Sequence, residues 1–378
     1  MSDRNKLLGP AETVGATANN YASPRPRPTA LDGGPLKMKL NFQLILSMNV
    51  TLQKQRAPGW AAVAAVALAS AGAAVWVSQQ ARKAEQRHPA RGRFIHIEGM
   101  RLHYRVEGEG PAVLLLHGNM VHGADFDASG LLARLSRNNR VLVIDRPGFG
   151  YSDRTRGRSW TPAEQARLLC RAAVALGFER FAVVGHSLGT QVAIAMALGD
   201  PAHVNRLVLV SGYYFPSMRL DVPIAMLGAI PWLGDAMRYS VSSLTSRLAL
   251  GPAVRAMFAP QKVPAGFDEA LPREMLLRPL QQRATSEDGA HMVPQARALR
   301  EHIAAIKVPV TLIAGDQDKV VNGRSQSGRL HHVLPNSRFH LLRGVGHMAH
   351  YQAQELIANA VAGTEDVPGG QGQSGRPA

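Results

Sequence analysis

From Phe94 onward, the sequence alternates short apolar runs with longer segments of helical character, and this pattern restricts the possible folds more than any other feature. Consecutive apolar residues without polar alternation are typical of parallel strands that are buried on both faces. The sequence therefore predicts an α/β domain over residues 94–363, with a mostly parallel central sheet and helices on both of its faces. The runs are Ala112–Leu116, Val141–Ile144, Phe181–Val184, Leu207–Val210, Val310–Ala314 and Phe339–Leu342.

Local patterns define several of the other elements. Phe94–Glu98 and Leu102–Val106 alternate apolar and polar residues around Gly99-Met100, which predicts a β-hairpin at the start of the domain. Thr161-Pro162-Ala163-Glu164 is a capping box with proline at the first helical position, and it predicts a helix that extends to about Leu176. Two further helices are predicted at Gln191–Leu198 and Gln354–Val361.

One long interval interrupts this alternation. Between Leu207–Val210 and Val310–Ala314 the sequence contains no strand-like run and is rich in Met, Leu and Pro. We interpret residues 213–299 as a helical lid insertion. We expect it to cover the carboxyl ends of the strands, where sheets of this kind bind their ligands.

A Gly-x-Ser-x-Gly motif, Gly185-His186-Ser187-Leu188-Gly189, lies between the run Phe181–Val184 and the helix predicted from Gln191. A serine on a sharp strand-to-helix turn projects its hydroxyl clear of the sheet, and glycines two residues to either side relieve crowding of the backbone. The helix N-terminus also offers free N–H groups to a developing negative charge. Ser187 is therefore the candidate nucleophile.

With this motif in this position, the chain resembles the serine-nucleophile branch of the α/β-hydrolase superfamily, whose esterase- and lipase-like members carry a lid. The resemblance extends over residues 94–363. It implies the α/β-hydrolase fold and a catalytic triad in the chain order Ser, Asp, His. The acid is expected on the loop after a late strand, and the histidine on the loop after the last strand.

Both positions are occupied by suitable residues. Gly315-Asp316-Gln317-Asp318 follows the next-to-last apolar run, and the family pattern selects Asp318 as the acid, with Asp316 as the second choice. Gly344-Val345-Gly346-His347 follows the last run and supplies His347 as the base. His347 would take the Ser187 proton and later give it to the leaving group, while Asp318 would orient the imidazole.

The resemblance also implies an oxyanion hole with two donors. One is the N–H of the residue after the nucleophile, here Leu188. The other comes from the loop after the third strand, which His117-Gly118-Asn119-Met120 resembles. We assign the Asn119 N–H as this second donor, with Met120 as the fallback.

The remaining polar residues near these loops are interpreted as structural. Asp145-Arg146-Pro147-Gly148-Phe149-Gly150-Tyr151-Ser152 resembles the family's loop after the fourth strand, with Asp145 and Ser152 bonding the backbone. His122, His186 and His350 are expected to be packed or solvated side chains. No pair or triplet of residues has metal-ligand spacing in the sequence, so neither a metal nor a cofactor is predicted.

A serine at the nucleophile position limits the classes of reaction that we expect. Haloalkane dehalogenases and epoxide hydrolases of this fold use an aspartate there, so Ser187 argues against their chemistry even though Asn119 resembles the dehalogenase halide-binding position. The loop at His117 also lacks the HGGG run of one lipase and esterase group. We therefore expect a serine hydrolase that cleaves a small-molecule carboxylic ester, thioester or lactone through an acyl-serine intermediate. The Met- and Leu-rich lid favours an apolar acyl group.

Two alternatives stay open. One is a cofactor-free haloperoxidase-like enzyme or a C–C bond hydrolase that uses the same triad. The other is a non-catalytic α/β-hydrolase that binds a ligand or a protein partner. A non-catalytic relative usually lacks a member of the triad, and here all three are present.

The N-terminal part of the chain has a different character. Residues 1–56 are polar and proline-rich, so we expect them to be disordered, and Met38 and Met48 are alternative initiators. Residues 57–78 carry no charge and would span about 30 Å as a helix, which predicts a single-pass transmembrane signal anchor. A signal peptide cleaved near Ala69-Ser70-Ala71 and a soluble alanine-rich helix are the alternatives. The basic residues that follow favour a cytoplasmic domain, but the preceding tail is also basic, so the orientation stays open.

Charge and cysteine content exclude other classes. The net charge is +16, but the basic residues of the domain are scattered, so no nucleic-acid partner is predicted, and anionic lipid is the better partner for the N-terminal part. The single cysteine, Cys170, rules out an internal disulfide and is expected to be a small core residue. Residues 364–378 are expected to form a disordered tail.

Overall fold

The computed structural model describes residues 59–217 and 222–365. The chain divides into two compact units, residues 1–63 and 64–378. In the first unit the described part is the start of helix α2 (Trp60–Arg87), where the Ala62 N–H donates to the carbonyl of Gly59. The predicted disordered segment 1–56 and most of the predicted tail 364–378 lie outside the described residues.

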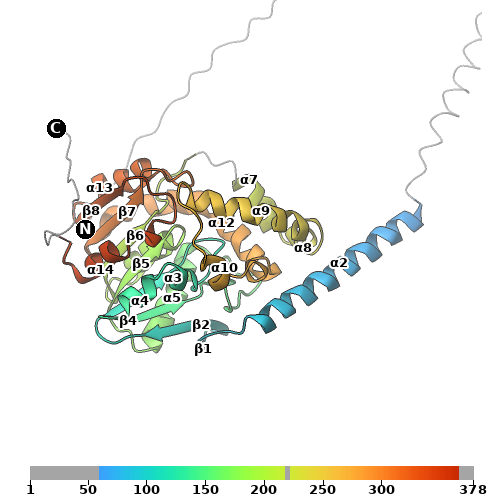
Figure 1. Ribbon diagram of the computed structural model, residues 1–378, viewed down its shortest axis with the longest axis horizontal. Coiled ribbons are helices and arrows are strands. Elements are labelled where there is room, and N and C mark those ends of the chain that lie inside the picture. The colour runs from blue at the N-terminus through green and yellow to red at the C-terminus, as the bar shows by residue number, and fades with distance from the viewer. Residues whose placement is uncertain (1–58, 218–221, 366–378) are drawn as a thin grey trace, which may run out of the picture. The chain divides into compact units, whose positions relative to one another are not determined.

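Eight strands of the second unit form one mixed sheet in the order β1-β2-β4-β3-β5-β6-β7-β8 (Figure 1). The pairs β1/β2 and β2/β4 are antiparallel, and all other neighbouring strands are parallel. The predicted hairpin and the mostly parallel sheet are therefore confirmed. The strands are β1 (Arg93–Ile97), β2 (Met100–Glu107), β3 (Ala112–Leu116), β4 (Arg140–Ile144), β5 (Phe181–His186), β6 (Val204–Val210), β7 (Val310–Gly315) and β8 (Ser337–Leu342).

The central strands are apolar throughout because both faces of the sheet are covered. In β3, Leu114 and Leu116 pack into the core on one face, and Val113 and Leu115 pack into the core on the other. All four side chains are fully buried. Successive residues of a strand point to opposite faces, so only an uninterrupted apolar run can supply both cores.

Helices cover both faces of the sheet (Figure 1). The N-cap half of the predicted capping box is formed, because the Thr161 hydroxyl accepts from the Glu164 N–H at 3.2 Å where α5 begins, whereas the Glu164 carboxylate accepts from Arg158 at 2.9 Å. Cys170 is buried in the core between α5 and the sheet. The helices outside the long insertion are α3 (Asp125–Ala128), α4 (Leu131–Leu135), α5 (Pro162–Ala175), α6 (Gly189–Gly199), α13 (Arg329–Val333) and α14 (Gln354–Ala362), with short turns η2 (Ile303–Ala305), η3 (Arg324–Gly328) and η4 (Ala349–Tyr351).

The interval between β6 and β7 is helical, and we call α7–α12 the helical insertion. Its first helix begins at Val222 rather than at residue 213, because Tyr213–Phe215 are buried, with Tyr214 and Phe215 in the main core. Helices α7, α8, α9 and α12 lie together beside the sheet (Figure 1). The bounds are α7 (Val222–Ala229), α8 (Leu233–Arg238), α9 (Val241–Phe258), α10 (Phe267–Ala270), α11 (Arg273–Leu276) and α12 (Pro279–Arg300).

Helix α2 extends past the predicted limit at residue 78 and ends at Arg87, because residues 78–87 are polar but good helix formers. By length and composition, it is the one helix among the described residues that could cross a membrane, with a mean hydropathy of 1.9 over 18 residues. Within the second unit, its C-terminal half contacts the helical insertion, and Val77 and Ala84 are buried. The polar contacts are Arg278 with Glu85 at 2.6 Å, Glu274 with His88 at 3.0 Å, and Arg247 over the ring of Trp76 at 5.2 Å.

Candidate active site

Four loops meet at the carboxyl ends of the parallel strands. The loops after β3 and β5 are neighbours, because β3 pairs directly with β5 while the chain has crossed to β4 on the opposite side of β3. Such a point, where the strand order reverses, is where open α/β sheets bind ligands. The loops after β7 and β8, which carry the predicted acid and histidine, complete the site.

Ser187 lies on a strained turn between β5 and α6. Its φ angle is +51°, a conformation that costs free energy for a residue with a side chain, and its N–H donates to the carbonyl of Val210 at 2.8 Å. The flanking glycines allow the turn to pack closely. A Cβ on Gly185 would lie 2.8 Å from the Gly189 carbonyl oxygen, and one on Gly189 would lie 2.3 Å from the Leu116 carbonyl oxygen. Only glycine therefore fits at these two positions.

The structure brings Ser187, His347 and Asp318 into one hydrogen-bonded line. The distance from Ser187 Oγ to His347 Nε2 is 2.9 Å, and that from His347 Nδ1 to Asp318 Oδ2 is 2.8 Å. A carboxylate can only accept, so His347 carries its proton on Nδ1 and Nε2 is free to accept from the serine hydroxyl. This is the tautomer that a general base for Ser187 needs.

The two candidate acids differ in position. Asp318 is buried, and its second oxygen accepts from the N–H groups of Val320 and Val321, both at 2.8 Å. Asp316 is exposed, and its carboxylate accepts from the Gly344 N–H instead. The geometry therefore places Asp318, and not Asp316, against the imidazole.

The loop after β3 lies against the nucleophile. A Cβ built on Gly118 would stand 3.1 Å from Ser187 Cβ. Of the two candidate donors on this loop, the Met120 N–H already donates to the Asn119 side-chain oxygen at 3.1 Å. The Leu188 N–H, at the start of α6, has no acceptor in the part of the chain that the structure describes. These contacts favour Leu188 and Asn119 as the two donors.

His117, at the start of this loop, is a neutral structural group. It is fully buried, and its Nε2 accepts from the Arg146 N–H at 2.9 Å, so Nδ1 carries the proton and donates to the Gly118 carbonyl at 2.8 Å. Burial, together with the charge of Arg146, lowers the pKa of His117 to about 3. The ring therefore stays neutral and keeps both hydrogen bonds at physiological pH.

Three further groups lie close together behind the triad. Ligand atoms of Asp125, His186 and His350 lie within 4.8 Å of one another, although they are far apart in the sequence. The Asp125 carboxylate already accepts from His350 Nε2 at 3.0 Å and from the Tyr351 hydroxyl at 2.8 Å. Burial and the two neighbouring histidines lower the pKa of His186 well below its ordinary value. The cluster therefore forms a buried hydrogen-bonded support under His347, whose carbonyl accepts from His186 Nε2 at 3.2 Å.

The loop after β4 has the structural role that the sequence predicts. The Asp145 carboxylate accepts from His103 Nδ1 at 2.7 Å and from the Gly123 and Tyr151 N–H groups at 2.8 and 3.0 Å. The Ser152 hydroxyl donates to the Asp145 carbonyl at 2.7 Å. Burial alone raises the pKa of Asp145, but the hydrogen bond from His103 and the electrostatic interaction with the neighbouring histidines hold it below its usual range.

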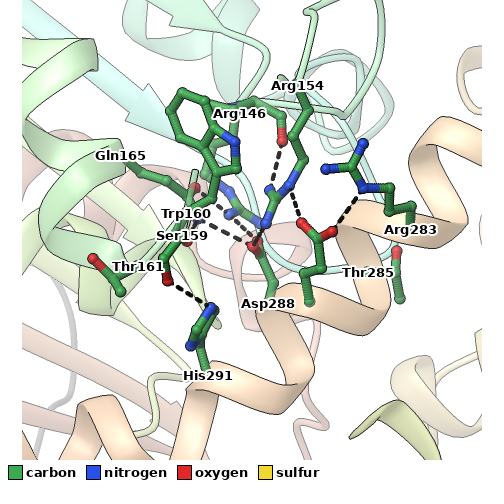
Figure 2. A network of polar contacts seen from close by, with 12 residues as sticks. Arg146, Arg154, Ser159, Trp160, Thr161, Gln165, Arg283, Thr285, Asp288 and His291 are labelled. Atoms are coloured by element: carbon green, nitrogen blue, oxygen red, sulfur yellow. Dashed lines mark hydrogen bonds and ion pairs between the residues drawn. The ribbon is translucent and has the colours of Figure 1, made fainter. Parts of the chain in front are cut away.

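Sequence reasoning missed several residues that hold the loop after β3 in place. We call residues 117–120 of this loop the candidate oxyanion loop. Arg146 was assigned only to a structural loop, and its partner Asp288 lies in the middle of helix α12 (Figure 2). Gln281 and Thr285 of the same helix also contact the loop. No local pattern marks these residues. The contacts of α12 join segments more than a hundred residues apart, and Arg146 lies 28 and 29 residues from the two carbonyls that its guanidinium contacts.

Comparisons with known proteins agree with the fold. The model of the alpha/beta hydrolase fold family matches residues 111–354, which is more than half of the chain, and the chain therefore belongs to this family. The 2-hydroxymuconate semialdehyde hydrolase of Pseudomonas putida is 26% identical over 280 residues, which cover 74% of this chain and 95% of that protein. Family membership and this relative support hydrolase activity.

Two solved structures share the fold at low sequence identity. The esterase of Thermogutta terrifontis, with malate bound, has a TM-score of 0.58 at 21% identity, and the match covers 72% of this chain and 97% of that one. A membrane phospholipase A, described as a bacterial virulence factor, has a TM-score of 0.56 at 20% identity. That match covers 87% of this chain and 99% of the phospholipase.

Gly189→Ala tests the close packing behind the nucleophile. The added methyl group would meet the Leu116 carbonyl at 2.3 Å, so α6 must move away from β3 and carry the Ser187 turn with it. We expect a loss of about 1–3 kcal/mol in the free energy of unfolding and a fall of about 10²-fold in turnover. Urea unfolding and hydrolysis of a chromogenic ester measure the two effects. Gly199→Ala, in the same helix with no atom within 4 Å, is the control that should leave both near the wild-type values.

Asp145→Asn tests the buried carboxylate. The pKa of Asp145 is lower in the folded than in the unfolded protein, so its stabilisation is present above the unfolded value of about 3.9 and is lost as the pH falls through the folded value. We expect the variant to lose about 3 kcal/mol of unfolding free energy at pH 7. This difference should shrink as the pH falls below about 4.

Unfolding curves at several pH values measure the effect of Asp145→Asn. Asp153→Asn is the control, because Asp153 forms an exposed ion pair with Arg101 and should change the stability little. A difference between wild type and Asp145→Asn that stays constant with pH would contradict the assigned role of the carboxylate.

Proposed function

We propose that the protein is a serine hydrolase that cleaves a carboxylic ester with an apolar acyl group through an acyl-Ser187 intermediate. The observation that carries this proposal is the line of hydrogen bonds from Ser187 Oγ to His347 Nε2 and from His347 Nδ1 to Asp318. A serine hydroxyl with a correctly oriented base, next to two N–H groups, is the arrangement that acyl transfer requires.

The reaction follows from this arrangement. The Ser187 hydroxyl gives its proton to His347 Nε2 as its oxygen attacks the carbonyl carbon, and the N–H groups of Leu188 and Asn119 bind the oxyanion. The tetrahedral intermediate expels the alcohol, which takes the proton from His347 and leaves the acyl group on Ser187. Water, deprotonated by the same imidazole, then attacks the acyl-enzyme; the bond to Ser187 Oγ breaks, the imidazolium returns its proton to Oγ, and the carboxylic acid is released.

The surroundings of the site favour an apolar acyl group. An apolar cluster extends from the helical insertion to the site loops and joins Phe258 of α9 to Val121 beside the oxyanion loop and to Met348 beside His347. Met120 packs against the same cluster. Methionine adapts to irregular apolar surfaces, so a hydrocarbon chain is the ligand group that this region would accept. Thioesters and lactones with apolar acyl groups react by the same steps.

C–C bond hydrolysis is the second candidate function. The observation that favours it is the similarity to the 2-hydroxymuconate semialdehyde hydrolase of Pseudomonas putida, which extends over 95% of that enzyme. A panel of p-nitrophenyl esters of increasing chain length, together with 2-hydroxymuconate semialdehyde, separates the two functions. The ester proposal predicts hydrolysis of the esters with a preference for longer acyl chains, whereas a C–C hydrolase would leave them uncleaved and consume the semialdehyde.

Substitution of two triad residues tests the mechanism. We expect Ser187→Ala to lower the turnover of the best ester by at least about 10³-fold and Asp318→Asn to lower it by about 10⁴-fold, because the amide would hold the wrong imidazole tautomer. Steady-state hydrolysis, with folding checked by circular dichroism, is the measurement. Asp316→Asn is the matched control on the same loop and should keep near wild-type turnover. Wild-type turnover in Ser187→Ala would contradict the mechanism.

We further propose that helix α2 anchors the protein to a membrane. Its apolar part has exposed side chains, including Val66 at 67% and Leu68 at 75% exposure, which favours lipid rather than protein as its surroundings. The match to the membrane phospholipase A covers 87% of this chain, a larger share than the match to the esterase. Both observations support an anchor over a soluble helix.

The helical insertion carries apolar side chains that agree with this location. Arg247 of α9 lies over the ring of Trp76 of α2, and the next residue, Leu248, is 72% exposed. Trp232, at the start of α8, is 86% exposed, and a tryptophan of this kind is typical of the membrane interface. An insertion that touches the anchor and presents such side chains would lie close to the lipid, which is the source of substrates with long acyl chains.

The double substitution Val66→Lys and Leu68→Lys tests the anchor in the full-length protein. A lysine at the centre of a membrane helix costs about 2.5–3.5 kcal/mol, so two of them should move the protein from the membrane fraction to the soluble fraction. Gln79→Lys, beyond the apolar part of the helix, is the control that should stay in the membrane. The mass of the wild-type chain distinguishes an anchor from a cleaved signal peptide, because cleavage would leave a mature chain that begins after Ala71. A double variant that stays with the membrane would contradict the anchor.

A further inference from the structure

Arg146 connects the loop after β4 to the candidate oxyanion loop. Its side chain is fully buried, and its guanidinium donates from Nε to the His117 carbonyl and from Nη2 to the Gly118 carbonyl, both at 3.0 Å. Its own backbone N–H donates to His117 Nε2. Arg146 therefore makes three hydrogen bonds to two consecutive residues of the oxyanion loop.

The contact with Gly118 determines the direction of the neighbouring N–H. The Gly118 carbonyl and the Asn119 N–H belong to one planar trans peptide unit, so they point in opposite directions. The Gly118 oxygen accepts from Arg146 Nη2 and also from His117 Nδ1. Two donors on the carbonyl side thus hold the Asn119 N–H facing the other way, while Gly118 itself stands against Ser187.

A carboxylate of helix α12 holds the guanidinium in place. Asp288 Oδ2 accepts from Arg146 Nη1 at 2.6 Å, and Asp288 Oδ1 accepts from Arg154 Nη2 at 3.0 Å and from Gln165 Nε2 at 3.1 Å. The side chains of Asp288, Arg146 and Arg154 are all fully buried. Figure 2 shows the two arginines converging on Asp288 from the core side of α12. A buried guanidinium without this partner would be an uncompensated charge next to the site.

Helix α12 also holds the oxyanion loop directly. The Asn119 side chain donates from Nδ2 to the Thr285 carbonyl at 3.1 Å, and Gln281 Nε2 donates to the Met120 carbonyl at 2.9 Å. Every residue from His117 to Met120 is therefore linked to α12 by hydrogen bonds, either directly or through Arg146. The helix belongs to the framework of the site, although the sequence places it in the insertion.

We propose that Arg146 and Asp288 are positioning residues that orient the Gly118–Asn119 peptide, so that the Asn119 N–H can bind the oxyanion of the reaction. This inference rests on the proposed serine hydrolase function. It assigns to α12 the role of fixing the second oxyanion donor. The pair acts on the transition state through the peptide and does not touch the substrate.

Kinetics of Arg146→Lys and Asp288→Asn test the proposal. In Arg146→Lys, the lysine keeps the positive charge but lacks the planar guanidinium that contacts two carbonyls and a carboxylate at once. In Asp288→Asn, the asparagine removes the negative charge that holds the guanidinium in place. Because an oxyanion donor acts mainly in the transition state, we expect the kcat for a p-nitrophenyl ester to fall by about 10²-fold while KM stays within about threefold. The rate of fluorophosphonate labelling of Ser187 should fall in parallel.

Glu287→Gln is the matched control. Glu287 is the neighbouring acid on α12 and pairs with Arg154 and Arg283, but it has no contact with the oxyanion loop among the described residues. We expect its kcat to stay within about threefold of wild type. An equal loss of kcat in all three variants, or a wild-type kcat in Arg146→Lys, would overturn the proposal. If Asp288→Asn does not fold, the kcat of Arg146→Lys alone tests the proposal, because this variant keeps a positive charge opposite Asp288.

Hydrogen–deuterium exchange separates this inference from the proposed function. The peptide that contains residues 117–120 should exchange faster in Arg146→Lys and Asp288→Asn than in wild type or Glu287→Gln. If the wild-type protein cleaves no ester but this exchange pattern is found, the proposed function fails while the positioning contact stands. Unchanged exchange in an active enzyme would overturn the positioning role alone.

Discussion

Strands β3 and β5 pair in parallel at the centre of the sheet, with Leu116 opposite Gly185, and the rest of the site depends on this pairing. Because both strands end at the same edge, the loop after β3 and the Ser187 turn leave the sheet side by side. Glycine at positions 118 and 189 lets the backbones of these segments approach closely, as the proposed pair of N–H donors requires. His347, from the loop after β8, then contacts Ser187, and Asp318, from the loop after β7, contacts His347.

The network around the triad consists largely of groups that are buried and paired. His117 and His186 are kept neutral by burial, whereas Asp145, Asp125 and Asp288 are buried carboxylates that each accept several hydrogen bonds. Burying a polar group costs free energy unless it is hydrogen-bonded, so the bonds of the three carboxylates hold the side chains and loops around them in place. Such a rigid network would hold the proposed N–H donors at a defined position.

Much of the fold could be predicted from the sequence because strands and turns follow from local patterns, and the three triad residues could be predicted because the Gly-x-Ser-x-Gly motif carries a resemblance to a family with a known triad order. An apolar run predicts a strand that is buried on both faces, and the glycines around Ser187 predict a sharp turn. The contact between Arg146 and Asp288 could not be predicted, because it joins residues separated by 142 positions and depends on how α12 packs. The start of the insertion was misplaced for a related reason, since the aromatic residues Tyr213–Phe215 fit a helix or a core equally well in sequence but are held in the core by Gln326.

Labelling of the purified full-length protein with a fluorophosphonate, followed by mapping of the adduct by mass spectrometry, would show whether Ser187 is an activated nucleophile. The reagent reacts with a serine only where a base and an oxyanion hole activate it. The account predicts one adduct, on Ser187, in the wild-type protein and none in His347→Ala. A folded wild-type protein that forms no adduct, or forms it on another serine, would contradict the assignment of Ser187 as an activated nucleophile and would favour a non-catalytic binding role for this fold.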